Sequence, residues 1–128
     1  MTFSNLCNDI FGKSTGDYHI TDSVDAPMNN PYELKTIEYY LYLKNWIDAV
    51  QWHFEDIIRD PQIDPVEALK LKRRIDKSNQ DRTDLVELFD SYFFDKYKDV
   101  VSLPNATINT ESPAWAVDRL SILALKIY

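Results

Sequence analysis

Hydrophobic and polar residues along this chain follow the period of α-helices, and prolines punctuate the periodic stretches. All six prolines lie between or at the starts of these stretches, and only two glycines occur. So few turn-forming residues favour long helices joined by a small number of loops. The pattern predicts a short helix near residues 3–11, a loop to residue 29, and main helices over 31–59, 65–97 and 113–128.

The starts of the three main helices share one signature, which occurs as NPYE at 30–33, DPVE at 64–67 and SPAW at 112–115. Each begins with a side chain that can cap a helix, followed by proline at the first helical position, where a missing N–H costs nothing. The first two add a glutamate three residues after the cap and so complete a capping box.

The connection at 60–64 is short, so the helices on either side of it are expected to pack as an antiparallel hairpin. We find no convincing strand. The predicted fold is therefore all-α, an antiparallel helical bundle of three long helices plus a short N-terminal helix, in a single domain over 1–128. Because the last helix ends without glycine, proline or a polar stop, we expect the domain to be incomplete at its C-terminus.

The helix predicted over 31–59 has two apolar stripes on nearly opposite sides. The main stripe, expected to face the core, contains Tyr40, Leu43, Trp46, Ile47, Val50, Phe54, Ile57 and Ile58. The second begins with apolar residues and becomes polar, through Leu34, Ile37, Leu41, Asp48, Trp52, Glu55 and Arg59. This helix is thus covered on two sides, or it presents the polar end of the second stripe at a cleft.

Trp52, Glu55 and Arg59 are spaced by three and four residues, so they share a helical face. They could form an indole packed over a surface ion pair, or a ligand-facing carboxylate oriented by arginine beside a stacking surface. His53 lies about 200° from Glu55 around the axis, so the two cannot bind one metal together. We expect His53 to be a partly buried residue at the edge of the core.

On the helix predicted over 65–97, Asn79 and Arg82 interrupt an apolar seam. Burying such groups costs free energy unless each finds partners, and Asp76 is a nearby candidate. They could form an internal polar layer that fixes helix register, or a pocket for an anionic or sugar-like ligand.

The last helix is apolar on almost every side and should be central, yet it carries Asp118 and Arg119. A buried carboxylate and a buried guanidinium each require a partner of opposite charge. We expect Asp118 or Asp90 to pair with Arg82 or Arg119.

Composition narrows the classes of function. The net charge of −7 disfavours general nucleic-acid binding, which depends on neutralising phosphates. No apolar run is long enough for a membrane span, and no secretory signal is visible. Cys7 is the only cysteine, and we expect it to act as a small buried hydrophobe. These features favour a cytoplasmic protein.

Several catalytic and metal-binding motifs were tested. The stretch FGKSTG at 11–16 lacks the first glycine of a phosphate loop, and neither histidine has the E-x-x-H spacing of a di-iron bundle. One cysteine and two histidines do not make the usual zinc sets, so no metal or cofactor is expected. Glu87-x-x-Asp90 resembles half the magnesium site of all-helical nucleoside triphosphate pyrophosphohydrolases, with Glu55 as a further ligand, but the partner helix lacks the matching spacing.

Three segments together resemble an uncharacterised bacterial family, domain of unknown function 4254. They are WHFED at 52–56, KRRIDKSNQDRTDLVE at 72–87 and INTESPAWAVDRLSILALKIY at 108–128. The resemblance implies a mostly helical bacterial protein, often encoded near genes for envelope polysaccharide or lipopolysaccharide glycosyltransfer. It also implies the positions to watch: Trp52, Glu55, Asp76, Asn79, Gln80, Arg82, Glu111, Asp118 and Arg119.

The leading hypothesis is a binding or accessory protein linked to envelope polysaccharide synthesis rather than an enzyme. It would recognise a sugar-phosphate or a glycosyltransferase partner. The first alternative is a magnesium-dependent hydrolase of a phosphorylated substrate that uses Glu55, Glu87 and Asp90. The second is a structural module that forms homo-oligomers through the apolar last helix.

Overall fold

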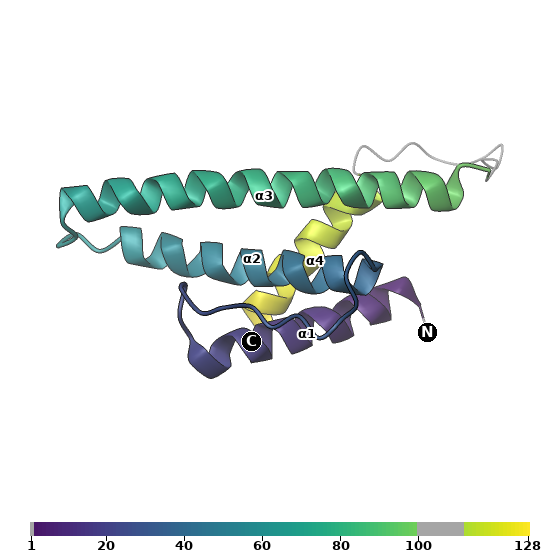
Figure 1. Ribbon diagram of the computed structural model, residues 1–128, viewed down its shortest axis with the longest axis horizontal. Helices are drawn as coiled ribbons and strands as arrows, with labels where there is room; N and C mark the ends of the chain where they lie inside the picture. The colour runs from purple at the N-terminus through teal and green to yellow at the C-terminus, as the bar shows by residue number, and fades with distance from the viewer. Residues whose placement is uncertain (1, 100–111) are drawn as a thin grey trace.

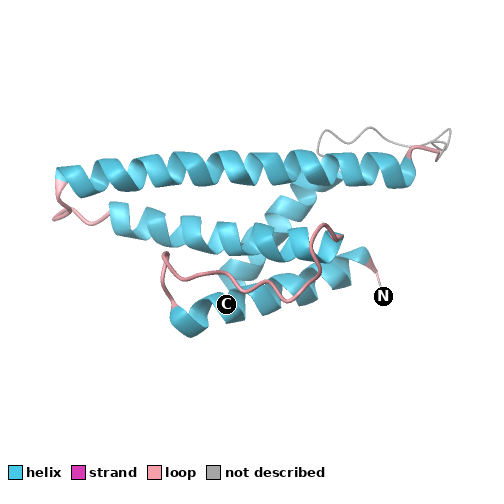
Figure 2. Cartoon of the chain, in the orientation of Figure 1, coloured by secondary structure: helices cyan, strands magenta, loops and turns pink. Residues whose placement is uncertain are grey.

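Four helices make up the protein in a computed structural model that describes residues 2–99 and 112–128 (Figures 1 and 2). They are α1 (Phe3–Thr21), α2 (Ile37–Ile58), α3 (Pro65–Tyr97) and α4 (Pro113–Ile127). No strand occurs within these two described ranges. The predicted all-α class is confirmed.

The helices α3 and α4 begin where their capping residues predict. The Asp64 carboxylate accepts hydrogen bonds from the backbone N–H groups of Val66 at 3.1 Å and Glu67 at 3.2 Å. The Ser112 hydroxyl accepts from the N–H of Trp115 at 3.3 Å. Both helices have proline in the first turn, so local capping chemistry is sufficient to place these two starts.

The predicted start of α2 at residue 31 is wrong, because a second cap lies further along the chain. Lys35 has a left-handed backbone with φ 67°, which interrupts the helix predicted from residue 31. Thr36 then caps α2 by accepting from the N–H of Tyr39 at 3.2 Å. The Asn30 side chain instead accepts from the N–H of Tyr32 at 3.1 Å, so it stabilises a turn in the connection.

The predicted end of the first helix near residue 11 is also wrong, since α1 continues to Thr21 through Gly12 and Gly16. Two glycines inside a helix cost about 1 kcal/mol each relative to alanine. Burial of the opposite face offsets this cost, because Phe11 and Tyr18 are both completely buried. Tertiary packing therefore determines the length of α1.

The order of contacts along the helices gives their directions. Ser14 and Tyr18 of α1 contact Tyr42 and Trp46 of α2, so these two helices run parallel. In contrast, Gln51 of α2 bonds to Ser78 of α3 whereas Phe54 packs under Arg74, so these two helices are antiparallel. The predicted antiparallel arrangement thus holds for the α2–α3 hairpin, while the connection after α1 returns along the bundle (Figure 1).

Helix α2 lies between α1 and α3, and α4 crosses the three obliquely (Figure 1). The most buried residues of α2 include Leu41, Tyr42 and Ala49, whereas Ile57 from the predicted core stripe is 43% exposed. The core face of α2 is therefore rotated from the prediction, because α1 and α4 both pack on its first half.

The apolar core also contains Cys7. Burial raises the pKa of the Cys7 thiol to about 12, so it is a structural residue rather than a nucleophile, as the sequence predicts.

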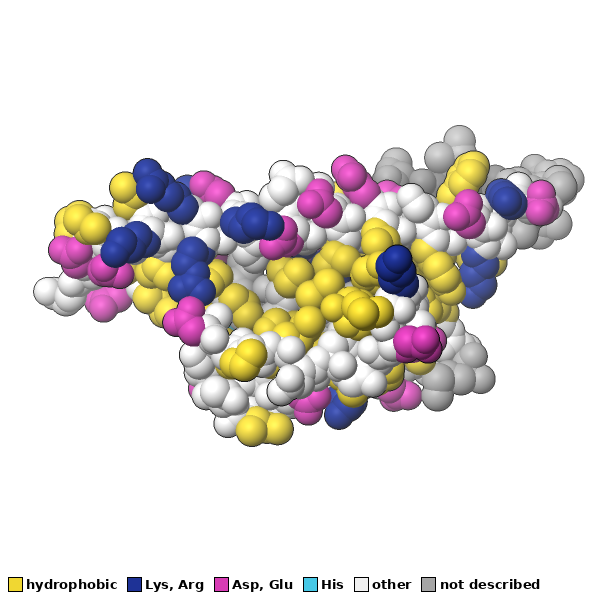
Figure 3. Space-filling model, viewed as in Figure 1, with side chains coloured by type: hydrophobic (Ala, Val, Ile, Leu, Met, Phe, Trp, Pro, Cys, Tyr) yellow, Lys and Arg dark blue, Asp and Glu magenta, His cyan; other side chains and the backbone are white. Residues whose placement is uncertain are grey.

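The surface retains apolar areas. Figure 3 shows hydrophobic side chains gathered in the middle of one face, below the row of basic side chains that follows α3. Helix α4 is less central than predicted, since Leu123 is 50% and Ile127 is 76% exposed. No helix in the described part of the chain has the length and apolar character needed to cross a membrane.

Candidate functional site

A group of charged side chains is buried where α2, α3 and α4 meet. Lys44 and Asp48 come from one face of α2, Arg82 from α3 and Asp118 from α4. The Lys44 side chain is fully buried, and the two carboxylates are at most 5% exposed. We call these four residues the ion network.

The ion network places two cations against two carboxylates. Arg82 binds Asp118 through two parallel hydrogen bonds, from Nε to Oδ1 and from Nη2 to Oδ2, both 2.8 Å long. The Lys44 ammonium lies between the carboxylates, bonded to Asp48 and 2.9 Å from Asp118 Oδ1. The predicted pairing of Asp118 with Arg82 is confirmed.

Neutral polar residues extend the ion network toward α1. The Ser121 hydroxyl donates to Asp48 at 2.7 Å, and the Asn45 amide donates to the Ser121 hydroxyl at 3.1 Å. The Asn45 oxygen in turn accepts from the Thr15 hydroxyl at 2.9 Å. The result is a continuous chain of hydrogen bonds through all four helices, in which each buried side chain has a partner.

The two carboxylates differ in their ease of ionisation. Burial raises the pKa of Asp48 above its usual range, although Lys44, Ser121 and Arg82 all act to lower it. Burial also opposes ionisation of Asp118, but the Arg82 hydrogen bonds and the Lys44 charge outweigh it, so the pKa of Asp118 is lowered. Asp118 is thus the more firmly charged partner, and it raises the pKa of Arg82 in return.

A cleft of about 350 Å³ opens directly over one side of the ion network. Asp48 and Arg82 belong to the ion network and also line the cleft. The remaining wall of the cleft is formed by Gln51, Trp52, Glu55, Asp56, Arg59, Ile122 and Leu125. The second stripe of α2 therefore presents its polar end at a cleft, which is one of the two arrangements that the sequence allows.

Three wall residues of the cleft are available to a ligand, two on the last turns of α2 and one at its C-cap. Trp52 is 40% exposed. Within residues 2–99 and 112–128, neither Glu55 nor Arg59 forms a side-chain hydrogen bond or ion pair, so the alternative of a Glu55–Arg59 surface ion pair is not what the structure shows. Arg82 adds to this set, because Asp118 occupies only two of its five N–H donors.

Other predicted site residues lie away from the cleft. Asp76 is exposed and bonds to Lys72 at 2.8 Å, and Gln80 bonds to Asp84 at 2.8 Å. Asn79, predicted on the buried seam, is exposed and accepts from Gln51 at 2.8 Å. The residue that takes its buried position is Ser78, one place earlier on α3.

Of the two predicted positions in the C-terminal segment, the structure describes one, and that residue does not line the cleft. Arg119 is an exposed residue of α4, next to the buried Asp118. Glu111 lies outside the described residues.

The three carboxylates of the magnesium alternative do not converge. Glu55 lies close enough to Lys72 to influence it electrostatically. Glu87 lies fifteen residues after Lys72 on α3, which is about 22 Å along the helix axis at 1.5 Å per residue. Glu87 and Asp90 are both exposed at that level of the bundle, so one ion cannot contact all three carboxylates.

His53 lies on the other side of α2 from Glu55, with its side chain 30% exposed, as the sequence predicts. Its ring stacks on Tyr18 at 5.1 Å between centroids. Among the described residues, the group of possible metal ligands that does converge is His19, Asp22 and His53. Sequence reasoning missed this group because it assigned His19 and Asp22 to a loop.

Comparison with known proteins identifies the family. The model of a family described as a protein of unknown function, DUF4254, matches residues 38–128. The chain belongs to this family. No curated protein and no solved structure gave a match.

The match to DUF4254 covers the ion network and the cleft but not all of the bundle. Both features are built by α2, α3 and α4, which lie within the matched residues except for the first position of α2. Helix α1 precedes the match, although it supplies Thr15 to the hydrogen-bond chain. The DUF4254 segment therefore contains every residue that lines the cleft.

Proposed function

We propose that this DUF4254 protein binds a phosphorylated sugar in the cleft. The observation that supports the proposal best is the wall at the C-terminal end of α2, where an exposed indole is followed by a carboxylate and a guanidinium that pair with no described residue, in the order Trp52, Glu55 and Arg59. Each group suits a different part of such a ligand.

The chemistry of these groups matches a sugar-phosphate. An indole face packs against the apolar C–H face of a pyranose ring, and a carboxylate accepts hydrogen bonds from sugar hydroxyls. Arg59 can bind a phosphate through two parallel N–H donors. The cleft volume of about 350 Å³ lies in the range of small-molecule sites, and Ile122 and Leu125 supply its apolar side.

Binding rather than covalent catalysis is the role that the cleft wall favours. Its residues include carboxylates, arginines, a glutamine and apolar side chains, but no serine, cysteine, lysine or histidine. The described residues of the wall thus include no serine or cysteine nucleophile and no histidine or lysine to activate one, and their carboxylates suit hydrogen bonding to sugar hydroxyls. We keep the prediction of a binding protein over that of an enzyme.

The wider setting of the proposal rests on the family resemblance rather than on the geometry. From that resemblance we propose a role in a bacterium, and from the composition a cytoplasmic one, near the synthesis of envelope polysaccharide and lipopolysaccharide. A protein of this kind would hold a phosphorylated sugar or present it to a glycosyltransferase.

Titration calorimetry with glucose 1-phosphate, glucose and inorganic phosphate tests the proposal. Wild type should bind the phosphosugar more tightly than either fragment, because only the phosphosugar reaches both Trp52 and Arg59. Arg59→Gln should weaken binding by about 10-fold or more, since a hydrogen bond to a charged group is worth about 1.5–3 kcal/mol. Trp52→Ala should weaken the binding of glucose and of the phosphosugar, but not that of phosphate.

Arg73→Gln is the matched control, because Arg73 is an exposed arginine that lines a different cavity, on the other side of α2. It should bind glucose 1-phosphate as wild type does. Absence of heat with all three probes at millimolar concentration would contradict the proposal, as would equal losses in Arg59→Gln and Arg73→Gln.

Self-association is a second candidate, favoured by the apolar residues that α4 leaves exposed. Trp115 is 45%, Leu123 50% and Ile127 76% exposed. Burial of such side chains between two copies would contribute to a homo-oligomer. Light scattering during size-exclusion chromatography should then show a mass that rises with loading concentration, whereas a constant monomer mass would remove this candidate.

A further inference from the structure

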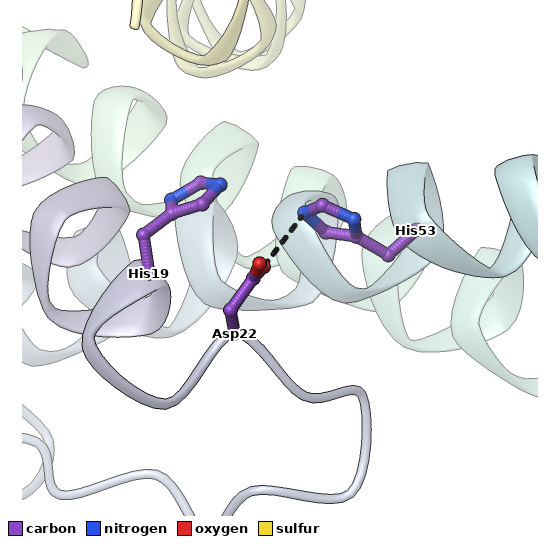
Figure 4. A group of neighbouring side chains, drawn as sticks. All are labelled: His19, Asp22 and His53. Carbon is purple, nitrogen blue, oxygen red and sulfur yellow. Dashed lines mark ion pairs between the residues drawn. The ribbon is translucent and has the colours of Figure 1, made fainter.

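We propose that His19, Asp22 and His53 form a binding site for a divalent transition-metal ion such as zinc. His19 lies in the last turn of α1, Asp22 follows that helix directly, and His53 faces them from α2. Figure 4 shows the two imidazole rings on either side of the Asp22 carboxylate. None of these three residues lines the sugar-phosphate cleft, and the existence of this site does not depend on that proposal.

The distances allow one ion to reach all three side chains. The available ligand atoms all lie within 4.8 Å of one another, and His53 Nε2 is 3.9 Å from Asp22 Oδ1. Bonds of about 2.0–2.2 Å to zinc would place the ligand atoms about 3–3.5 Å apart. Rotations that move these side-chain ends by about 1 Å would close the site.

The hydrogen bond of His19 prepares its ring for metal binding. His19 Nδ1 is 2.7 Å from the backbone carbonyl of Thr15, which can only accept, so Nδ1 carries the proton. The neutral ring then presents the lone pair of Nε2. A histidine that donates its other N–H to a carbonyl is the usual arrangement around protein-bound metals, where it fixes the tautomer and the ring orientation.

Asp22 and His53 are also held in place. Asp22 caps α1 with a left-handed backbone, φ 55°, and its N–H donates to the Tyr18 carbonyl at 2.9 Å. The His53 ring stacks nearly parallel to the Tyr18 ring, at 17°. Two packed helices therefore carry the three candidate ligands, which limits the cost of ordering them around an ion.

A cavity beside the three side chains supplies an independent observation. It is lined by Asp22 and His53 together with Tyr18, Ser23, Val24, Asp56 and Ile57. Tyr18 is completely buried, and within the described part of the chain its hydroxyl has no hydrogen-bond partner. A buried hydroxyl without a partner costs about 1–3 kcal/mol, and a water or anion on the metal would accept a hydrogen bond from it.

The donor set determines the class of ion. Two imidazoles and one carboxylate suit zinc and other late first-row metals, whereas magnesium prefers oxygen ligands. Three protein ligands leave at least one coordination position for water or a small ligand, on the side of the cavity. Asp56, one turn after His53, lines the same cavity.

Calorimetric titration of the untagged protein with zinc chloride, and with cobalt chloride followed by visible absorption, tests the site. Wild type should bind one ion per chain, and cobalt should develop the intense bands of a low-coordinate complex. Magnesium should give no heat. Asp22→Asn and His53→Gln should each weaken zinc binding by at least about 10-fold.

The variants keep the proposal testable if a mutation disturbs folding. Asparagine tolerates the left-handed conformation of residue 22, so Asp22→Asn should retain the wild-type circular dichroism spectrum. Asp25→Asn changes an exposed carboxylate three residues further on, which pairs with Arg74, and should bind zinc as wild type does. No zinc binding by wild type, or equal affinity in wild type, Asp22→Asn and His53→Gln, would overturn the assignment.

Discussion

The two halves of α2 carry polar residues of similar type in opposite environments. In the first part, which extends as far as Asp48, Lys44 and Asp48 are buried and paired through the ion network. In the second half, Glu55 and Arg59 line an open cleft and pair with no described residue. The difference arises because α4 places the polar groups of Asp118 and Ser121 against Lys44 and Asp48, whereas near Glu55 and Arg59 it contributes only the apolar Ile122 and Leu125 to the cleft wall. A charged residue on this helix is therefore structural or available to a ligand according to what covers it.

The largest expected effect comes from removing a charge from the covered half. Lys44→Met should lower the free energy of unfolding by about 3–5 kcal/mol, because Asp48 and Asp118 would stay buried with Arg82 as their remaining cation. Chemical denaturation monitored by circular dichroism measures this loss. Lys72→Met removes an exposed lysine that pairs with Asp76 and should leave the denaturation midpoint unchanged. Equal effects of the two substitutions would show that the network does not stabilise the fold.

A smaller loss, with a defined dependence on pH, is expected at Asp118. Asp118→Asn should cost about 2–3 kcal/mol near pH 7, since Arg82 loses one of its two charge-assisted bonds. The pKa of Asp118 lies below its ordinary value of 3.8, so the folded state favours the ionised form. The contribution of ionised Asp118 to the free energy of unfolding is complete above about pH 4, and it is lost as the pH falls through the lowered pKa.

The difference in unfolding free energy between wild type and Asp118→Asn should therefore shrink below pH 4. Denaturation curves of both proteins at several pH values measure it. A difference that stays constant down to pH 2 would contradict the assigned direction of the pKa shift.

The features that could be predicted from the sequence are those that depend on neighbouring residues or on one pair of side chains. The start of α3 follows from Asp64 and Pro65, because a cap needs only its own neighbours. The Arg82–Asp118 pair follows from the need of each buried charge for an opposite one. Trp52 and Glu55 could be placed together because residues three apart share a helical face.

What the sequence did not predict depends on packing between elements. Lys44 was missed because an isolated lysine in a helix is usually exposed, and only the crossing of α4 shows that it is buried. The extension of α1 was missed because Gly12 and Gly16 resemble a stop, while its stabilisation comes from Tyr18 packing on α2. The group of His19, Asp22 and His53 was missed for the same reason, since it exists only when α1 reaches residue 21.

The length of α1 can itself be tested by substitution at a glycine. A methyl group at Gly12 would meet no atom within 4 Å. Gly12→Ala should therefore raise the unfolding free energy by about 0.5–1 kcal/mol through the higher helix propensity of alanine. Thermal or chemical denaturation checks this gain. A loss of stability would indicate that the chain is not helical at this position.

The smallest effects on stability are expected in the open half of α2. Glu55→Gln and Arg59→Gln should each change the unfolding free energy by less than about 0.5 kcal/mol, because neither side chain has a hydrogen-bond or ion-pair partner among residues 2–99 and 112–128. Denaturation midpoints compared with that of Lys44→Met would give the sharpest contrast between the two halves. A loss above 2 kcal/mol in either variant would place that residue in a structural network.

We propose that the open half of α2 binds a ligand while the covered half stabilises the fold. Calorimetric titration of Arg59→Gln with glucose 1-phosphate, on protein whose denaturation midpoint has been measured in the same buffer, separates the two roles. We expect an unchanged midpoint and phosphosugar binding weakened by about 10-fold or more. A lowered midpoint with binding equal to that of wild type would show that Arg59 is structural and not part of a ligand site.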